Sequence, residues 1–182
     1  MVGRNERGAR VRLTALCLGG ANTLDADRKA ALALFTPDLI VACNHAGRDA
    51  AHVDHWVTMH PELFPRWIAD RRAKGLPDAG RLWSVKHRPS PVECERLTSE
   101  GGSSGMFCIQ VALHLGCTHI VLSGIPLDKH AEHYDYAGKW MDAPRYRANW
   151  TRYASVMAGR VRSVSGWTRD LLGAPDERWL GD

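Results

Sequence analysis

Short apolar runs alternate along the chain with longer amphipathic stretches. The runs at 11–18, 39–43 and 119–122 are rich in apolar residues and too short for typical helices, as expected of buried strands. The stretches between such runs carry apolar residues at helical spacing. The remaining expected elements are strands at 53–59, 81–86 and 160–164 and helices at 23–35, 61–74, 104–115 and 144–158.

Strands separated by helices predict an α/β fold. We expect a three-layer α/β/α sandwich with a mostly parallel, Rossmann-like sheet of about six strands. Right-handed crossovers place the carboxyl ends of all parallel strands at one edge of the sheet, and ligands bind beyond that edge. The expected organisation is a basic N-terminal arm at residues 1–10 and one domain of this kind over residues 11–182.

Composition narrows the class of protein. The 182 residues are 45% hydrophobic and 24% charged, the ordinary balance of a globular chain, and no apolar run is long enough for a membrane span. The five cysteines are scattered through apolar segments, and no signal-peptide pattern opens the chain. We therefore expect reduced thiols and a cytoplasmic protein. The net charge of +4 is spread along the chain, so no clear nucleic-acid binding is expected; a homo-oligomer is compatible with the sequence.

Small and amide residues follow three of the expected strands. Gly19, Gly20 and Asn22 come after the first strand, Asn44 after the second, and Ser123-Gly124 ends the strand near 120. Asparagine at such a place either hydrogen-bonds a ligand or simply tolerates a turn. Because these strand ends meet at one edge, the sequence favours a shared pocket there.

A serine–glycine corner, Ser103-Ser104-Gly105, leads directly into an apolar helix. The N–H groups and positive dipole end of a helix N-terminus bind phosphate well. The alternative interpretation is a flexible loop with an ordinary N-cap. The corner is not a Walker A loop, because no Lys-Ser/Thr pair follows its glycines, and Gly19-Gly20 does not open a G-x-G-x-x-G dinucleotide motif.

The loop after the strand near 120 is dense in titratable groups. Asp128, His130, His133 and Tyr134 lie where parallel-sheet enzymes place working loops. A histidine there is a candidate general base, and a tyrosine hydroxyl a candidate phosphate ligand; the alternative is a solvated loop.

Four histidines, His45, His52, His55 and His60, cluster around Asp54. Such side chains can bind zinc, but His55 and His60 are five residues apart on an expected strand and point to opposite faces. Contact between one or two of these histidines and a ligand is the favoured reading, and no metal site is assigned.

Several of these segments together resemble a known group. The runs 103–108 (SSGMFC), 112–116 (ALHLG) and 120–125 (IVLSGI) resemble the SSG–helix–G–strand–SGID series of bacterial family 42 sialyltransferases and of the wider MptE-like, Maf-type group. The run 18–24 (LGGANTL) resembles the group's GNGPSL turn, and 42–44 (ACN) its strand-ending CN.

The resemblance implies a Rossmann-like domain that binds a nucleotide-activated sugar. By position, Gly19–Asn22, Asn44 and Ser103–Gly105 would surround the nucleotide, Tyr134 would bind phosphate, and Arg96 would be a basic residue upstream of the corner. Two features depart from the pattern. The Asp expected after SGI is Pro126, with Asp128 two residues later, and the histidine expected near residues 146–150 is absent. His133 or His130 would take its role.

Three functions follow from these expectations. The first is a glycosyltransferase that uses a CMP- or NDP-sugar, with His133, His130 and Asp128 as catalytic candidates. The second, implied by the MptE-like resemblance, is diphosphate transfer from ATP, which needs Mg²⁺. The third is a non-catalytic nucleotide-binding protein. Apart from the donor substrate, no cofactor is assigned. The carboxylates available for Mg²⁺ in the second reading are Asp25, Asp27, Asp54 and Asp128.

Overall fold

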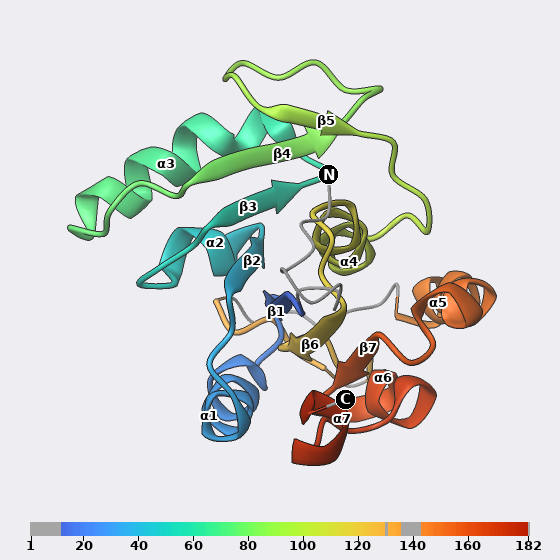
Figure 1. Cartoon of the computed structure of the whole chain (residues 1–182). Helices are drawn as coiled ribbons and strands as arrows, with labels where there is room; N and C mark the ends of the chain where they lie inside the picture. Colours follow the sequence, from blue (N-terminus) through green and yellow to red (C-terminus); the bar gives the residue numbers. More distant parts are fainter. Residues whose placement is uncertain (1–11, 130, 136–142, 182) are drawn as a thin grey trace, which may run out of the picture.

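Seven parallel strands form one sheet in the computed structural model, which describes residues 12–129, 131–135 and 143–181 (Figure 1). The strand order is β5-β4-β3-β2-β1-β6-β7. Every pair of neighbouring strands is parallel, as buried apolar runs joined by helical crossovers require. The strands are β1 (Thr14–Leu18), β2 (Leu39–Cys43), β3 (His55–Thr58), β4 (Arg81–Val85), β5 (Glu95–Leu97), β6 (His119–Ser123) and β7 (Val161–Ser163).

Helices cover both faces of this sheet. On one face, Phe107 and Val111 of α4 pack over β1 and β2, and Trp150 of α5 joins the same core. On the other face, Ala31 of α1 and Trp67 of α3 pack in a second core with side chains of β1 and β2. The helices are α1 (Leu24–Leu34), α2 (His45–Asp49), the 3-10 turn η1 (Pro61–Leu63), α3 (Phe64–Ala73), α4 (Ser104–His114), α5 (Ala143–Met157), α6 (Gly166–Leu172) and α7 (Glu177–Gly181).

The predicted α/β/α sandwich with a parallel sheet is confirmed, but several short elements escaped prediction. The sheet has seven strands, not six, because β5 adds a three-residue strand at the edge. Its sequence, Glu-Arg-Leu, is too short and too polar to show a strand period. The short helices α2, α6 and α7 were also missed, since five to seven residues make barely two helical turns.

Two expectations from composition have counterparts in the structure. Cys17, Cys43, Cys108 and Cys117 are buried free thiols, and Cys94 is a partly exposed one. Within the described ranges, no helix has both the length and the apolar character needed to cross a membrane.

The direction in which strands are added to the sheet changes beside β1. From β1 the chain adds β2 to β5 in one direction, and α4 then returns it to β6 on the opposite side of β1. The turns that follow β1 and β6 are therefore neighbours. Gly19 N–H donates to Ser123 O (2.8 Å) and Ala21 N–H donates to Gly124 O (3.0 Å). In parallel α/β sheets such a switch point is where a ligand crevice forms.

The buried carboxylate of Asp27 ties this region together. Its Oδ2 accepts from Gly124 N–H (2.9 Å), from the Thr23 hydroxyl (2.9 Å) and from the Ser165 hydroxyl (2.6 Å). One side chain thus joins α1, the turn after β6 and the residue before α6. Removal of either partner of such a buried bond leaves a desolvated polar group, which is costly.

Gly19 is required by close packing. A Cβ at this position would overlap Ile125 Cγ1 and the Gly124 carbonyl oxygen, which belongs to backbone that cannot move aside easily. We expect Gly19→Ala to lower the free energy of unfolding by about 2–3 kcal/mol, in the range of overpacking substitutions. Gly181→Ala, where an added Cβ meets nothing within 4 Å, is the control and should change stability little. Chemical denaturation of both variants measures the difference, and equal midpoints would contradict the packing assignment.

Candidate functional site

Three of the predicted motifs converge around the buried side chain of Ile125. A Cβ on Gly105 would lie 3.0 Å from Ile125 Cγ2, and a Cβ on Gly19 would overlap Ile125 Cγ1. Ile125 itself directly follows Gly124. The turn after β1, the turn after β6 and the serine–glycine corner at the start of α4 are therefore adjacent, at the carboxyl edge of the sheet.

The turn after β1 has few main-chain donors left for a ligand. The N–H groups of Gly19 and Ala21 donate to Ser123 and Gly124, and Asn22 N–H donates to Glu132 O (2.8 Å). The glycines of this turn therefore serve close packing of the backbone more than direct anion binding.

The corner at the start of α4 is a capped helix N-terminus. Ser103 is buried, and its Oγ accepts from Met106 N–H (3.3 Å) and from Trp150 Nε1–H (3.2 Å). Its hydroxyl is thus used inside the protein. Ser104 and Gly105 are only half-buried, and the first N–H groups of a helix have no partner within the helix. The backbone of these two residues is the part of the corner suited to an anion.

Asn44 has a strained backbone. Its φ of 49° and ψ of −123° belong to a region that glycine adopts and L residues rarely do. Thr58 at the end of β3 donates its hydroxyl to Asn44 Oδ1 (2.8 Å), which fixes the amide plane. Among the described residues, Asn44 Nδ2 has no hydrogen-bond partner. The strand end therefore presents an oriented amide donor from a conformation that costs energy.

The strap, defined as residues 131–135, pairs with the turn after β1. Ala21 and His133 form an antiparallel bridge, and Tyr134 N–H donates to Gly20 O (3.1 Å). The His133 ring lies over Gly20, with Nε2 2.7 Å from the position that a Gly20 Cβ would occupy. The strap thus places a histidine beside the strand exits.

The proton on His133 is assigned by its neighbours. Asp135 N–H donates to Nδ1 (3.1 Å), so the neutral ring carries its proton on Nε2. Burial, together with the nearby His45 and Arg48, lowers the pKa of His133 to about 4, although the carboxylates of Asp135 and Asp49 oppose the shift. At neutral pH the ring is an uncharged donor through Nε2. The general-base role expected from the sequence requires the bond to Nδ1 to break.

His45 faces His133 from the start of α2. The two rings meet edge to face with centroids 5.0 Å apart, and His45 also packs edge-on against Trp67. Burial lowers the pKa of His45 as well. It follows Asn44 directly in the sequence and lies beside His133, and its contact with a ligand stays a prediction.

A small pocket of about 250 Å³ lies beside the strap. Asn22 and Tyr134, both predicted site residues, contribute to its wall together with Asp49. The Tyr134 hydroxyl donates to Asp49 Oδ2 (2.6 Å), so in this structure it contacts a carboxylate. Its predicted role in phosphate binding remains a hypothesis.

Two other predicted residues, Arg96 and Asp128, do not join this group. Arg96 lies in β5, which three strands separate from β1, and its guanidinium donates to the carbonyls of Val85 and Arg88. Asp128 accepts from Trp167 N–H (2.9 Å) and from Arg147 (3.4 Å), and so caps the start of α6. His130 lies outside the described residues.

The four carboxylates proposed for Mg²⁺ are dispersed. Asp25 pairs with Arg28 on the surface, Asp27 is bonded within the protein, and Asp128 caps α6. Asp54 accepts from Ile40 N–H (2.7 Å), before β3 and at the far edge of the sheet from the strand exits. Across the described ranges, no group of three or more His, Cys, Asp or Glu side chains is arranged to hold a metal ion.

The histidines that lie close together in the sequence occupy different places in the structure. His55 begins β3 and accepts from Trp83 Nε1–H (3.0 Å) in the interior, whereas His60 follows the end of that strand. Thr58 was absent from the set of site residues predicted from the sequence, and its only local signal was its position at a strand end. His45 was considered there only as a member of the histidine cluster.

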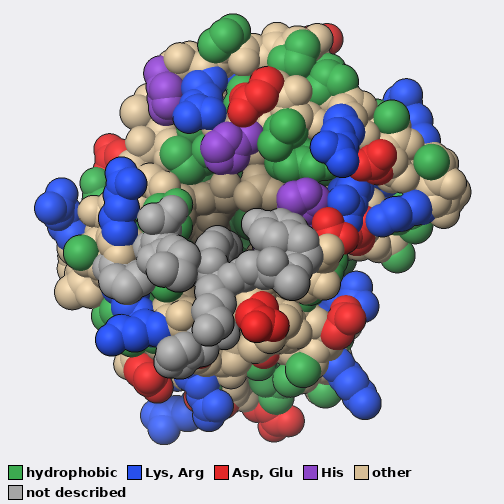
Figure 2. Space-filling model, turned by 180° about the vertical axis from the view of Figure 1, so that it is seen from behind, with side chains coloured by type: hydrophobic (Ala, Val, Ile, Leu, Met, Phe, Trp, Pro, Cys, Tyr) green, Lys and Arg blue, Asp and Glu red, His purple; other side chains and the backbone are tan. Residues whose placement is uncertain are grey.

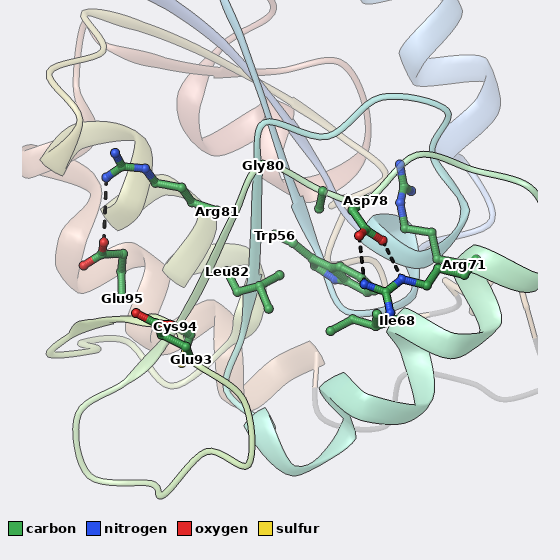
Figure 3. A pocket seen from close by; sticks show the side chains of 12 residues that line it. Trp56, Ile68, Arg71, Asp78, Gly80, Arg81, Leu82, Glu93, Cys94 and Glu95 are labelled. Atoms are coloured by element: carbon green, nitrogen blue, oxygen red, sulfur yellow. Dashed lines mark hydrogen bonds and ion pairs between the residues drawn. The ribbon is translucent and has the colours of Figure 1, made fainter.

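The face of the molecule opposite to the view of Figure 1 is hollowed at its centre. Figure 2 shows a central hollow bordered by histidine side chains, with basic and acidic side chains grouped beside one of them. A different cavity of about 420 Å³ lies between α3 and the beginnings of β4 and β5 (Figure 3). Four of its charged side chains form two ion pairs, Arg72 with Asp78 and Arg81 with Glu95. That cavity is at the amino edge of the sheet, away from the residues described above.

Comparison with known proteins adds information about the fold. No family model and no curated protein sequence matches the chain. The structure is similar to that of a mammalian sialyltransferase in complex with Gal-beta-1-3GalNAc-ortho-nitrophenol, with 13% sequence identity and a TM-score of 0.50 over 90% of this chain and 74% of that one. A second mammalian sialyltransferase structure matches with 14% identity and a TM-score of 0.48, over 89% and 72% of the two chains.

At such identities the likeness shows a shared fold alone. It supports the sialyltransferase-like architecture expected from the sequence. The narrower bacterial family 42 or MptE-like assignment stays a prediction.

The low pKa of His133 predicts a pH dependence of stability. Because a free histidine has a pKa of about 6.5, the unfolded chain binds more protons than the folded chain between that pH and about 4. The free energy of unfolding should therefore fall as the pH drops through this window. His133→Asn should flatten the dependence in part, since His45 shifts in the same direction. An NMR titration of His133 with a midpoint near its ordinary value would contradict this assignment.

Proposed function

We propose that the protein is a glycosyltransferase that uses a CMP- or NDP-sugar, bound at the carboxyl edge of the sheet beside β1 and β6. The observation that carries this proposal is the strained Asn44, whose amide is oriented by Thr58 beside the converging turns. Strain of this kind costs about 1–3 kcal/mol and persists where the surrounding structure imposes it, commonly at ligand sites. The sialyltransferase-like fold supports the choice of donor class.

In this proposal the nucleotide is bound by hydrogen-bond donors that make no hydrogen bond to the described residues. Asn44 Nδ2 would bond the nucleotide, and the N–H groups of Ser104 and Gly105 would bond its phosphate at the positive end of α4. The glycines after β1 would allow close approach without donating. Tyr134 would add a phosphate contact only if its hydroxyl turned away from Asp49.

In the transfer step, the bond between the anomeric carbon and the phosphate oxygen breaks. The acceptor oxygen forms a new bond to that carbon and loses its proton. We assign the neutral His133, through Nε2–H, to hydrogen-bond the leaving phosphate, which gains negative charge. A preorganised donor at developing charge contributes about 3–4 kcal/mol in known cases. His130 is the remaining sequence candidate for the base that takes the acceptor proton.

Calorimetric titration and thermal unfolding test the binding half of the proposal. CMP, CDP, UDP and GDP are the probes, and cytidine, which lacks phosphate, is the control. When the free nucleotide is at about 100 times its Kd, binding should raise the free energy of unfolding by about 2.7 kcal/mol. Cytidine should stabilise far less if α4 holds the phosphate. Absence of stabilisation by every nucleotide would overturn the proposal.

Release of nucleotide from CMP- and NDP-sugars, followed with a panel of acceptor glycosides, tests the transfer half. Turnover supports the proposal. Nucleotide binding without turnover supports the non-catalytic alternative instead. Binding of ATP that depends on Mg²⁺, with diphosphate transfer to an alcohol, would replace glycosyl transfer by the second alternative.

Asn44→Gly separates ligand binding from stability. Glycine adopts the backbone conformation of Asn44 without strain, which offsets the lost bond to Thr58, worth about 1 kcal/mol. We expect the unfolding midpoint to change little and nucleotide affinity to fall about tenfold, the effect of one hydrogen bond of 1.4 kcal/mol. Titration and denaturation of the same preparation measure both quantities. Unchanged affinity would remove Asn44 from the site.

A further inference from the structure

We propose that Asp49 is a positioning residue that fixes the orientation of His133 by holding the strap against α2. The inference rests on the proposed function of His133 and deepens it. It assigns to the end of α2 a role that the sequence did not suggest.

Asp49 gathers donors from three parts of the chain. Arg48 donates Nε–H to Oδ1 (2.8 Å) and Nη2–H to Oδ2 (2.6 Å). The Lys74 ammonium, just after α3, donates to Oδ1, and the Tyr134 hydroxyl donates to Oδ2 (2.6 Å). Burial acts to raise the pKa of Asp49, but these donors outweigh it and hold the pKa well below its usual range. The carboxylate is therefore charged at neutral pH.

Arg48 and Asp49 bond the side chains of two consecutive residues of the strap, Tyr134 and Asp135. Tyr134 is held through its hydroxyl, and the Asp135 carboxylate lies 2.9 Å from Arg48 Nη2. Arg48 and Asp49 are mostly buried here, with side chains 11% and 22% exposed, so water screens their charges less than at an open surface.

Tyr134 and Asp135 both contact the His133 ring. The Tyr134 ring stacks on the imidazole, with centroids 5.1 Å apart and an interplanar angle of 20°. Asp135 supplies the N–H that bonds Nδ1 and so places the proton on Nε2. The ring plane and the tautomer of His133 therefore both depend on residues that Asp49 and Arg48 hold in place. His45 on α2 packs edge to face against the His133 ring. The Nε2 atom of His45 lies 4.0 Å from Asp135 Oδ2.

Among the residues that the structure describes, the strap makes few main-chain bonds that would hold it otherwise. It pairs with the turn after β1 through Asn22 N–H and Tyr134 N–H, and Ala131 N–H donates to Asp128 O (3.1 Å). Such a short bridge is weak by itself. Without the side-chain bonds to α2, the strap would open locally at little cost to global stability.

Tyr134→Phe and Asp49→Asn test the proposal. Tyr134→Phe keeps the stacked ring and changes no charge, and Asp49→Asn keeps the shape of the carboxylate. The control is Arg72→Gln. Arg72 lies on α3, away from the strap, and the substitution breaks its exposed ion pair with Asp78. Long-range ¹H–¹⁵N NMR of the histidine side chains reports the tautomer and titration of His133. This readout needs no nucleotide and no turnover.

We expect both variants to lose the pure Nε2–H signature of His133, and Arg72→Gln to keep it. In Tyr134→Phe the pKa of His133 should also rise from about 4 toward its ordinary value as the ring becomes more exposed. Retention of the wild-type tautomer and pKa in Tyr134→Phe, or of the wild-type tautomer in Asp49→Asn, would overturn the proposal. If Asp49→Asn fails to fold, Tyr134→Phe alone decides.

Kinetics separate this proposal from the proposed function. If the wild type transfers a sugar, both variants should lower kcat about 10- to 100-fold, the effect of a catalytic group misplaced by about 1 Å, and change the donor KM less than threefold. A larger effect on KM than on kcat would contradict a positioning role. If the wild type shows no transfer, the proposed function fails, whereas the NMR result still decides whether Asp49 orients His133.

Discussion

The close approach of the two turns after β1 and β6 determines where every other part of the site lies. The backbone of Gly19 and Ala21 bonds directly to Ser123 and Gly124, at a separation that leaves no room for a Cβ at Gly19. Ile125 is thereby placed against the start of α4. The strap can then pair with Gly20 and bring His133 over the strand exits. A wider separation would leave these motifs near one another in topology but not in contact.

Internal bonding decides which polar groups remain for a ligand. Most main-chain donors of the turn after β1 are used, Ser103 is an N-cap bonded to Trp150, and the hydroxyl of Tyr134 faces a carboxylate. Among the described residues, the groups left are the amide of Asn44 and the first turn of α4. The first is a neutral donor and the second is the positive end of a helix dipole, a combination suited to a phosphate ester more than to a metal ion.

The sequence predicted what depends on periodicity and topology. Apolar runs, together with shorter strand-like segments between the helices, located six of the seven strands. Right-handed crossovers placed Gly19, Asn44 and Gly124 at one edge of the sheet. It could not predict β5, whose three residues carry no period, or the position of Arg96 far from β1. Likewise, the bond from Tyr134 to Asp49 joins residues 85 positions apart and is written in no local pattern.

The glycine motifs that this chain shares with the sialyltransferase-like group are also needed for packing, so their presence alone does not indicate function. Glycine at 19 and 105 is needed for contact with Ile125 whether or not a nucleotide binds, so such residues would persist on a scaffold that had lost its chemistry. Asn44 is different. Packing alone would favour glycine at its φ and ψ, and the side chain that stands there instead is oriented by Thr58 toward a position where the described protein offers it no further partner. A strained residue whose amide nitrogen has no partner among the described residues is the stronger sign of a ligand site.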